Sequence, residues 1–234
     1  MEGLETSGQS HWIPLSDLMT GLMMIFMLLT AMYMLRVEQT TTLIVQEHTK
    51  TKAELLRALQ ETFKKDLKQW DADFLGDMTL RFNNPDVIFA TGKADLKPEF
   101  KAILDELVPK YIEIITSEKF RNTVKEIRIE GHTSPIWVGV SEEEAYFKNM
   151  ELSQSRTRAT LEYILKMPSV SKDSAWIKEH LTANGLSSSK PIYKNPDTKE
   201  IDYLASQRVE FRIVTNAEDS IEKIANGLKE NVEL

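Results

Sequence analysis

The 234-residue chain contains no cysteine, and this absence excludes both disulfide bonds and thiolate metal sites. Basic residues are in the minority, since 29 Lys and Arg against 36 Asp and Glu give a formal net charge of −7. This acidic balance argues against nucleic acid as the main partner. A Gly-rich phosphate loop and a Gly-x-Ser-x-Gly elbow are both lacking. We therefore expect a protein that is not an enzyme and that carries no cofactor.

The sequence also lacks a metal-binding pattern. Its four histidines are dispersed, with no pair at the spacing of metal ligands: His11, His48, His132 and His180. His132 follows the end of a predicted strand, where a neutral structural histidine is the expected role. The acidic run 142–144 is expected to be a solvated loop. No metal site is predicted.

Charge is missing from residues 18–35, an apolar run that with 13–16 is long enough to cross ~30 Å of hydrocarbon. Residues 1–35 contain no Lys or Arg, and the run is too long for the apolar region of a signal peptide. No small-residue cleavage site follows Leu35. We therefore predict an uncleaved membrane helix over residues 12–35, after a tail formed by residues 1–11.

Asp17 stands at the start of this apolar run. A carboxylate inside a membrane span costs roughly 2.5–3.5 kcal/mol on insertion scales, so it usually has a function. The natural role for a lone carboxyl is to take up and release a proton, with sodium as the less favoured ion. Thr20 lies one turn further on the same face, where its hydroxyl could bond the carboxyl or a water. The alternative is an Asp that merely reaches the lipid headgroups.

The remaining residues predict an α+β fold, a mixed sheet covered by helices. Expected strands cover residues 78–82, 87–89, 124–129 and 208–214, and expected helices cover 51–70, 96–115, 152–167 and 174–183. Asn184-Gly185 is expected to cap the last of these helices in a left-handed conformation. We place a linker at 36–75, a globular domain at 76–216 and a polar helix or tail at 217–234.

An apolar stripe recurs at helical spacing in the linker: Leu56, Leu59, Phe63, Leu67 and Trp70. It could pack on the following domain, on a second copy as a short coiled coil, or on a membrane surface. A further alternative is a regulatory plug for a channel.

Two constellations resemble known families. The stretch Pro14-Leu-Ser-Asp17-Leu-Met-Thr20-Gly-Leu-Met-Met24 is similar to the single membrane helix of MotB-type stator subunits. In that family an Asp followed by Met-Thr accepts the proton, so the resemblance assigns this role to Asp17.

Residues 79–214 resemble the OmpA-like peptidoglycan-binding domain through five stretches in family order. They are Val87–Leu96, Ile129–Thr133, Asn149–Arg156, Asn184–Ile192 and Gln207–Glu210. The resemblance implies a pocket that grips the peptide stem of peptidoglycan, with a helix Arg on a carboxylate and a turn Asp on an amine. The candidate binding residues are Arg156, Thr133, Ser134, Asn149, Leu152, Ser153 and Arg208.

The family's Arg corresponds to Arg156, whose planar guanidinium suits a carboxylate. The family's Asp has no counterpart, because Ser134 follows Thr133 and supplies no charge. A nearby acid such as Glu142 could substitute for it.

Together the two resemblances imply a stator subunit, with a cytoplasmic amino terminus and a periplasmic domain in the bacterial inner membrane. Arg36, Lys50 and Lys52 after the helix favour the opposite orientation, and the domain outweighs them. The implied partners are a MotA-like membrane protein, a second copy of the chain and peptidoglycan. Within this group residues 76–96 look most like the ZorB subunits of Zorya anti-phage systems, whose MotA-like partner is ZorA. The alternatives are a flagellar or gliding stator, or a non-conducting tether to the cell wall.

Overall fold

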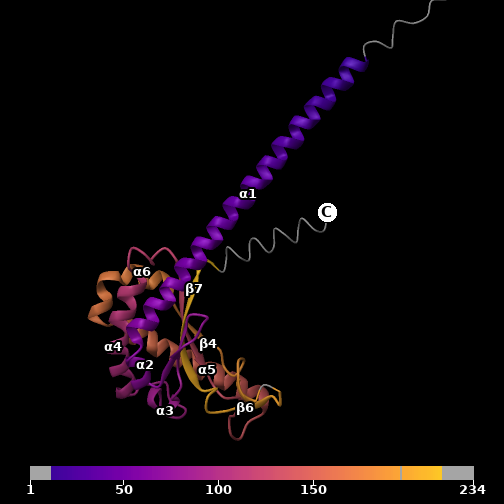
Figure 1. Cartoon of the computed structure of the whole chain (residues 1–234). Helices are drawn as coiled ribbons and strands as arrows, with labels where there is room; N and C mark the ends of the chain where they lie inside the picture. The colour runs from indigo at the N-terminus through magenta and orange to yellow at the C-terminus, as the bar shows by residue number, and fades with distance from the viewer. Residues whose placement is uncertain (1–11, 196, 218–234) are drawn as a thin grey trace, which may run out of the picture. The chain divides into compact units, whose positions relative to one another are not determined.

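The computed structural model describes residues 12–195 and 197–217, so the expected polar helix at 217–234 lies almost entirely outside the described residues (Figure 1). The chain divides into two compact units, at 1–47 and 48–234. Helix α1 (Trp12–Phe63) contributes its first part to one unit and its last part to the other.

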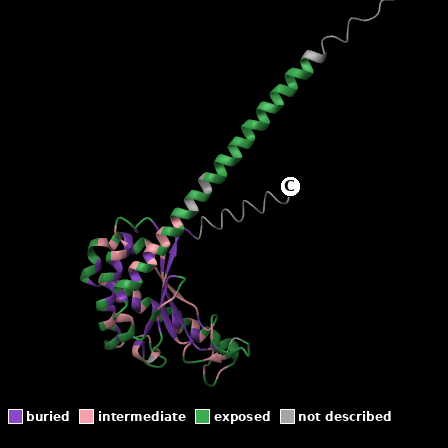
Figure 2. Cartoon of the chain, in the orientation of Figure 1, coloured by how far each residue is buried: buried purple, intermediate pink, exposed green. Residues whose placement is uncertain are grey.

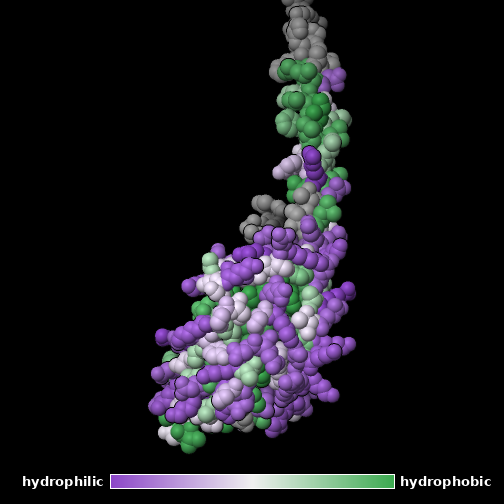
Figure 3. Space-filling model, turned by 90° about the vertical axis from the view of Figure 1, so that its left-hand side faces the viewer, coloured by the Kyte–Doolittle hydropathy of each residue, from purple (hydrophilic) through white to green (hydrophobic). Residues whose placement is uncertain are grey.

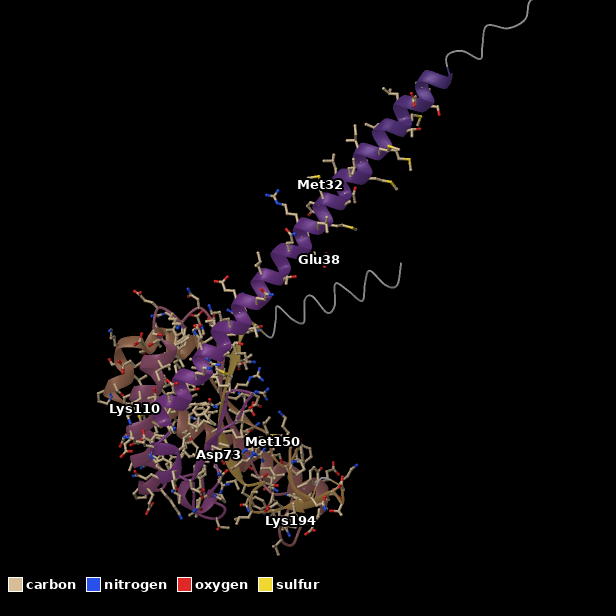
Figure 4. The ribbon with its side chains drawn as sticks, in the orientation of Figure 1. Met32, Glu38, Asp73, Lys110, Met150 and Lys194 are labelled. Carbon is tan, nitrogen blue, oxygen red and sulfur yellow. The ribbon has the colours of Figure 1, made fainter. Side chains whose placement is uncertain are left out.

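The first unit is a bare apolar helix. Leu15–Gln39 is long and apolar enough to cross a membrane, with a mean hydropathy of 2.0. At 1.5 Å per residue this segment is about 37 Å long, more than the ~30 Å of a bilayer's hydrocarbon core. All of its described side chains are exposed, and Met32 and the other methionines project outward from the helix (Figures 2 and 4). Nothing within the unit buries them.

The second unit is built on a five-stranded sheet in the order β1-β2-β7-β3-β4. Its strands are β1 (Ala72–Phe74), β2 (Thr79–Phe82), β7 (Arg208–Thr215), β3 (Val124–His132) and β4 (Leu181–Gly185). Neighbouring strands are antiparallel except for β3 and β4. A parallel pair needs a crossover, which is supplied by α5 (Glu142–Leu165), the 3₁₀ helix η1 (Pro168–Asp173) and α6 (Ser174–His180).

The remaining helices and a separate hairpin complete the unit. They are α2 (Asp66–Gln69), α3 (Pro85–Ile88), α4 (Pro98–Ile115) and a separate hairpin of β5 (Ile192–Asn195) and β6 (Glu200–Asp202). The α+β fold with a mixed sheet is therefore confirmed.

The two faces of the sheet differ because side chains alternate along each strand. Leu80, Ile127 and Phe211 belong to the face that packs into the helical core. There the ring of Phe82 meets that of Phe100 from α4 edge-on, with centroids 5.2 Å apart. The opposite face carries charged residues on β2, β3 and β7.

The last part of α1 belongs to this core. Leu55, Leu59 and Phe63 are fully buried, and Phe63 contacts Trp70 with ring centroids 5.8 Å apart. Of the alternatives for the apolar stripe, packing on the following domain is the one found, while Leu56 is only partly buried against the core.

Three local expectations are wrong. The acidic run 142–144 is not a loop but the first turn of α5, where the Glu144 N–H donates to the Ser141 hydroxyl and the acids lie at the positive end of the helix. Residues 87–89 do not form a strand, because Pro85 starts the short helix α3 and only Phe89 pairs, in an isolated bridge to Leu96. The helix predicted at 174–183 ends at His180, and Leu181–Gly185 forms β4 instead. Pairing with β3 decides this outcome, since Leu181 lies opposite Ile127. Gly185 is thus a strand residue and not a helix cap.

Candidate functional site

Two glycines bring helix α5 close to the end of the sheet. Gly131 on β3 and Gly185 on β4 are register partners. A Cβ on Gly131 would lie 2.7 Å from Thr157 Cγ2, and one on Gly185 would lie 2.4 Å from the Gln154 backbone nitrogen. Larger residues cannot occupy these positions without moving α5. The glycines therefore position the polar side chains of α5 against the carboxyl end of β3.

Arg156 projects from this part of α5 into the fold and is only 7% exposed. Its Nε donates to the Lys93 carbonyl oxygen at 2.9 Å and its Nη2 to the Ala90 carbonyl oxygen at 3.3 Å. The guanidinium carbon lies 4.8 Å from the centre of the Phe89 ring. Burial lowers the pKa of Arg156 to about 10, so it remains a cation at neutral pH.

No carboxylate among the described residues pairs with Arg156. A buried charge without a counter-ion is costly, and the two carbonyl bonds use only part of a guanidinium with five N–H donors. Arg156 lines a small pocket together with Phe89, Thr91, Gly131 and Arg208. The pocket therefore presents two arginines from different elements, which favours an anionic group such as a carboxylate.

Arg208 differs from Arg156 because it has an acidic partner. Its Nε donates to Glu210 Oε1 at 2.7 Å, and its Nη1 donates to the carbonyl oxygens of Lys190 and Ser206. Arg81 Nε lies 2.6 Å from the same Glu210 oxygen. Burial raises the pKa of Glu210, but His132 and Arg208 outweigh it and hold that pKa well below its usual range. These contacts fix the Arg208 side chain at the start of β7.

The Gly-His-Thr turn is held by Ser187. The Thr133 backbone N–H donates to the Ser187 carbonyl oxygen at 2.9 Å, and the Ser187 N–H donates to Ser153 Oγ at 3.1 Å. Ser187 Oγ donates in turn to the Tyr146 carbonyl oxygen. Ser153, proposed as a ligand contact, is thus fully buried and holds the turn onto α5.

Several buried polar atoms of this turn and of α5 have no hydrogen-bond partner. Among the described residues, Thr133 Oγ1, Asn149 Nδ2 and both ring nitrogens of His132 are of this kind. Native structures leave few such atoms unpaired, and clusters of them mark places where water, an ion or a ligand binds. Thr133 and Asn149 are both candidate residues from the sequence.

The other candidates are less closely grouped. Ser134 is buried beside Thr133, and Leu152 is half-buried on α5. Glu142 is exposed in the first turn of α5, beside Pro135, Glu143, Tyr146 and Phe147. Fourteen residues of helix separate Glu142 from Arg156, a distance of about 21 Å along the axis. Glu142 therefore does not face the Arg156 pocket.

In the first unit, Asp17 lies on the exposed surface of the apolar helix. Thr20 Oγ1 donates to the Ser16 carbonyl oxygen at 2.8 Å, one turn back. Here the Thr20 hydroxyl donates to the helix backbone and not to the Asp17 carboxyl, because the helix offers it an acceptor one turn back.

A relative among curated proteins decides the family. The chain is 40% identical over 219 residues to "Zorya protein ZorB" from Escherichia coli, covering 92% of both chains. The chain belongs to the ZorB family. No protein-family profile matches the ZorB-family chain.

Solved structures resembling this ZorB-family chain are more distant. A MotB-like protein from Desulfovibrio vulgaris has 20% identity and a TM-score of 0.48, covering 75% of this chain and 98% of that one. The type VI secretion cell wall anchor from Pseudomonas aeruginosa has 17% identity and a TM-score of 0.44, covering 67% and 96%. The periplasmic domain of Helicobacter pylori MotB has 17% identity and a TM-score of 0.43, covering 68% and 90%.

Sequence reasoning missed three parts of the site. Phe89 was assigned to a strand, whereas its ring lies against Arg156. Ser187 has no motif of its own, and its positive φ of 51° gave no signal in the sequence. Glu210 was noted only within the Arg-Val-Glu strand, although the register of β7 with β2 and β3 surrounds it with charges.

Proposed function

We propose that this ZorB-family chain is a single-pass stator subunit of the bacterial inner membrane that anchors a MotA-like partner, ZorA, to peptidoglycan. The amino terminus is cytoplasmic and the second unit is periplasmic. The observation that carries the proposal is Arg156, a buried cation without a carboxylate partner that lines a pocket with Arg208. A stem-peptide carboxylate would supply the missing charge.

The membrane helix supports the other half of the proposal. Its described apolar side chains are exposed, so a surrounding ring of partner helices or lipid would cover them. Asp17 would be protonated from the periplasm and deprotonated toward the cytoplasm. Each charge that crosses 100 mV releases about 2.3 kcal/mol, which would rotate the ZorA ring around two wall-anchored copies of this chain. In a Zorya system that rotation would serve defence against phage.

Wall binding is tested by sedimentation of the purified full chain with isolated peptidoglycan. We expect Arg156→Gln to weaken binding at least about tenfold, equivalent to about 1.4 kcal/mol. Arg156→Lys should weaken it less, because it keeps the charge but loses the planar fork. Arg158→Gln is the matched control, since Arg158 lies two residues away, exposed and paired with Glu162. Unchanged binding by a folded Arg156→Gln protein would refute the anchor.

Proton coupling is tested by Asp17→Asn in cells that carry the partner and the defence genes. We expect loss of protection against phage, with the protein level and wall binding unchanged. Glu38→Gln is the control, because Glu38 is also an exposed acid within Leu15–Gln39. Full protection by the Asp17→Asn protein would leave only a passive tether.

A further inference from the structure

Three buried groups on the charged face of the sheet are not explained by wall binding. Glu130 and His132 lie on β3 and Glu210 on β7, with exposures of 3%, 2% and 5%. Glu130 is the register partner of Glu210. One ligand atom from each residue lies within 4.8 Å of the other two. Strand pairing thus brings two buried carboxylates and a buried imidazole together.

No hydrogen bond joins His132 to either carboxylate. His132 Nε2 lies 3.4 Å from Glu210 Oε2 and 3.8 Å from Glu130 Oε2. Both ring nitrogens of His132 lack a hydrogen-bond partner among the described residues. The cluster therefore holds a buried imidazole whose nitrogens are unpaired, next to two carboxylate oxygens.

The two distances from His132 Nε2 are close to those between ligands that share a metal ion. Zinc binds imidazole nitrogen and carboxylate oxygen at roughly 2.0–2.2 Å, which puts tetrahedral ligands about 3.3 Å apart. The Glu210 carboxylate is also pre-oriented, because Arg81 and Arg208 both contact its Oε1 and leave Oε2 toward His132.

We propose that Glu130 Oε2, His132 Nε2 and Glu210 Oε2 bind one divalent transition-metal ion, with zinc the best match for this ligand set. A fourth position would be filled by water. The ion would tie the end of β3 to β7 directly below the turn that carries Thr133 and Ser134. This metal-binding role differs from the structural role expected for His132. Residue spacing along the chain could not have indicated the site, because its ligands come from two strands.

The test is metal analysis of the full chain purified in detergent. After treatment with a chelator and titration with Zn²⁺, we expect about one zinc per chain and a higher melting temperature than for the metal-free protein. Replacing zinc with Co²⁺ should give visible absorption bands of a nitrogen- and oxygen-ligated ion. A chain that binds no zinc above the buffer level, shows no cobalt bands and melts at the same temperature with and without metal would overturn the proposal.

Variants separate this site from adventitious binding. His132→Gln and Glu130→Gln should each lower zinc affinity at least about tenfold. Even the loss of a residue that only supports a metal ligand commonly has an effect of this size. His48→Gln, which removes a histidine on α1 outside the cluster, should bind zinc like the unmodified chain. If His48→Gln abolished binding while His132→Gln retained it, the assigned ligands would be wrong. Because cobalt spectra of the unmodified chain are informative alone, the test stands even if a variant does not fold.

Discussion

The two units of this chain handle charge in opposite ways. The membrane helix carries an acid, Asp17, near the start of a segment whose side chains are exposed. The second unit buries five charged or titratable side chains on one face of its sheet and at one pocket: Glu130, His132, Arg156, Arg208 and Glu210. Among them, Arg208 and Glu210 form a hydrogen-bonded ion pair. Figure 3 shows the contrast, with a hydrophobic helix surface and a largely hydrophilic domain surface.

This difference indicates where each unit obtains its stability. The second unit has its own core and an internal network in which Arg81 and Arg208 contact Glu210, so its folding depends on internal contacts. The helix can satisfy its apolar surface only with lipid or other helices. Arg156 lacks a carboxylate partner among the described residues and in this respect resembles Asp17. We assign an external ligand to both of these groups and to the cluster of Glu130, His132 and Glu210.

The largest expected effect comes from breaking the internal charge network. Glu210→Ala would leave Arg208 buried without its carboxylate, and removal of one partner from a buried pair costs about 3–5 kcal/mol. Denaturant unfolding of the full chain should show this loss. The control is Glu200→Ala, which removes only an exposed pair with Lys194. Equal stability of the two variants would mean that the buried network is not structural.

A second test is directed at the close approach of α5. Gly185→Ala would place a Cβ 2.4 Å from the Gln154 backbone nitrogen, so we expect a loss of about 1–3 kcal/mol in unfolding free energy. Gly76→Ala has open space around the new Cβ and serves as the control. Peptidoglycan binding should weaken with Gly185→Ala, because α5 carries Arg156. A neutral result would show that α5 shifts freely.

The third test uses pH. The pKa of Glu130 is lowered by His132 against the effect of burial, and the pKa of Glu210 is lowered by His132 and Arg208. Because both folded-state values lie below the unfolded value of about 4.3, their contribution is complete above that pH and is lost as the pH falls through the folded values. Unfolding free energy should therefore hold from neutral pH to about pH 5 and decline below it. A decline that began near neutrality would contradict this assignment.

The smallest expected effect is that of Asp17→Asn on stability. Since Asp17 is exposed on a helix outside the core, the unfolding free energy of the second unit should change by less than about 0.5 kcal/mol. Circular dichroism melting in detergent would measure it. Loss of defence with an unchanged melting temperature would show that Asp17 acts in function and not in folding. Strong destabilisation of the second unit would contradict that separation.

Local patterns predicted the regular elements well. The alternation at 124–129 and 208–214 indicated β3 and β7, because burial of one face leaves a periodic record in the sequence. Helical spacing indicated α4 and the second part of α5, but the first ten residues of α5, from Glu142, were not predicted as helix. Short elements were less predictable. Strand β4 depends on pairing with β3, and α3 depends on the start that Pro85 gives it. Neither effect is visible in a window of a few residues.

The site was predictable where a family motif carried it. Arg156 and Arg208 were named from their motifs and do line one pocket. The carbonyl partners of Arg156 and the contacts of Ser187 could not be predicted, since they join segments far apart in the chain. The register that places Glu130 opposite Glu210 is likewise a property of the sheet and not of either strand alone.

The burial of the last part of α1 has a mechanical consequence. Leu55, Leu59 and Phe63 belong to the same helix as the apolar segment and are fully enclosed by the second unit. A force applied along that helix would act in shear on all three packed side chains together. It would not simply extend a flexible linker. The load would therefore be shared across the core, and the anchor would fail only when the core itself yields.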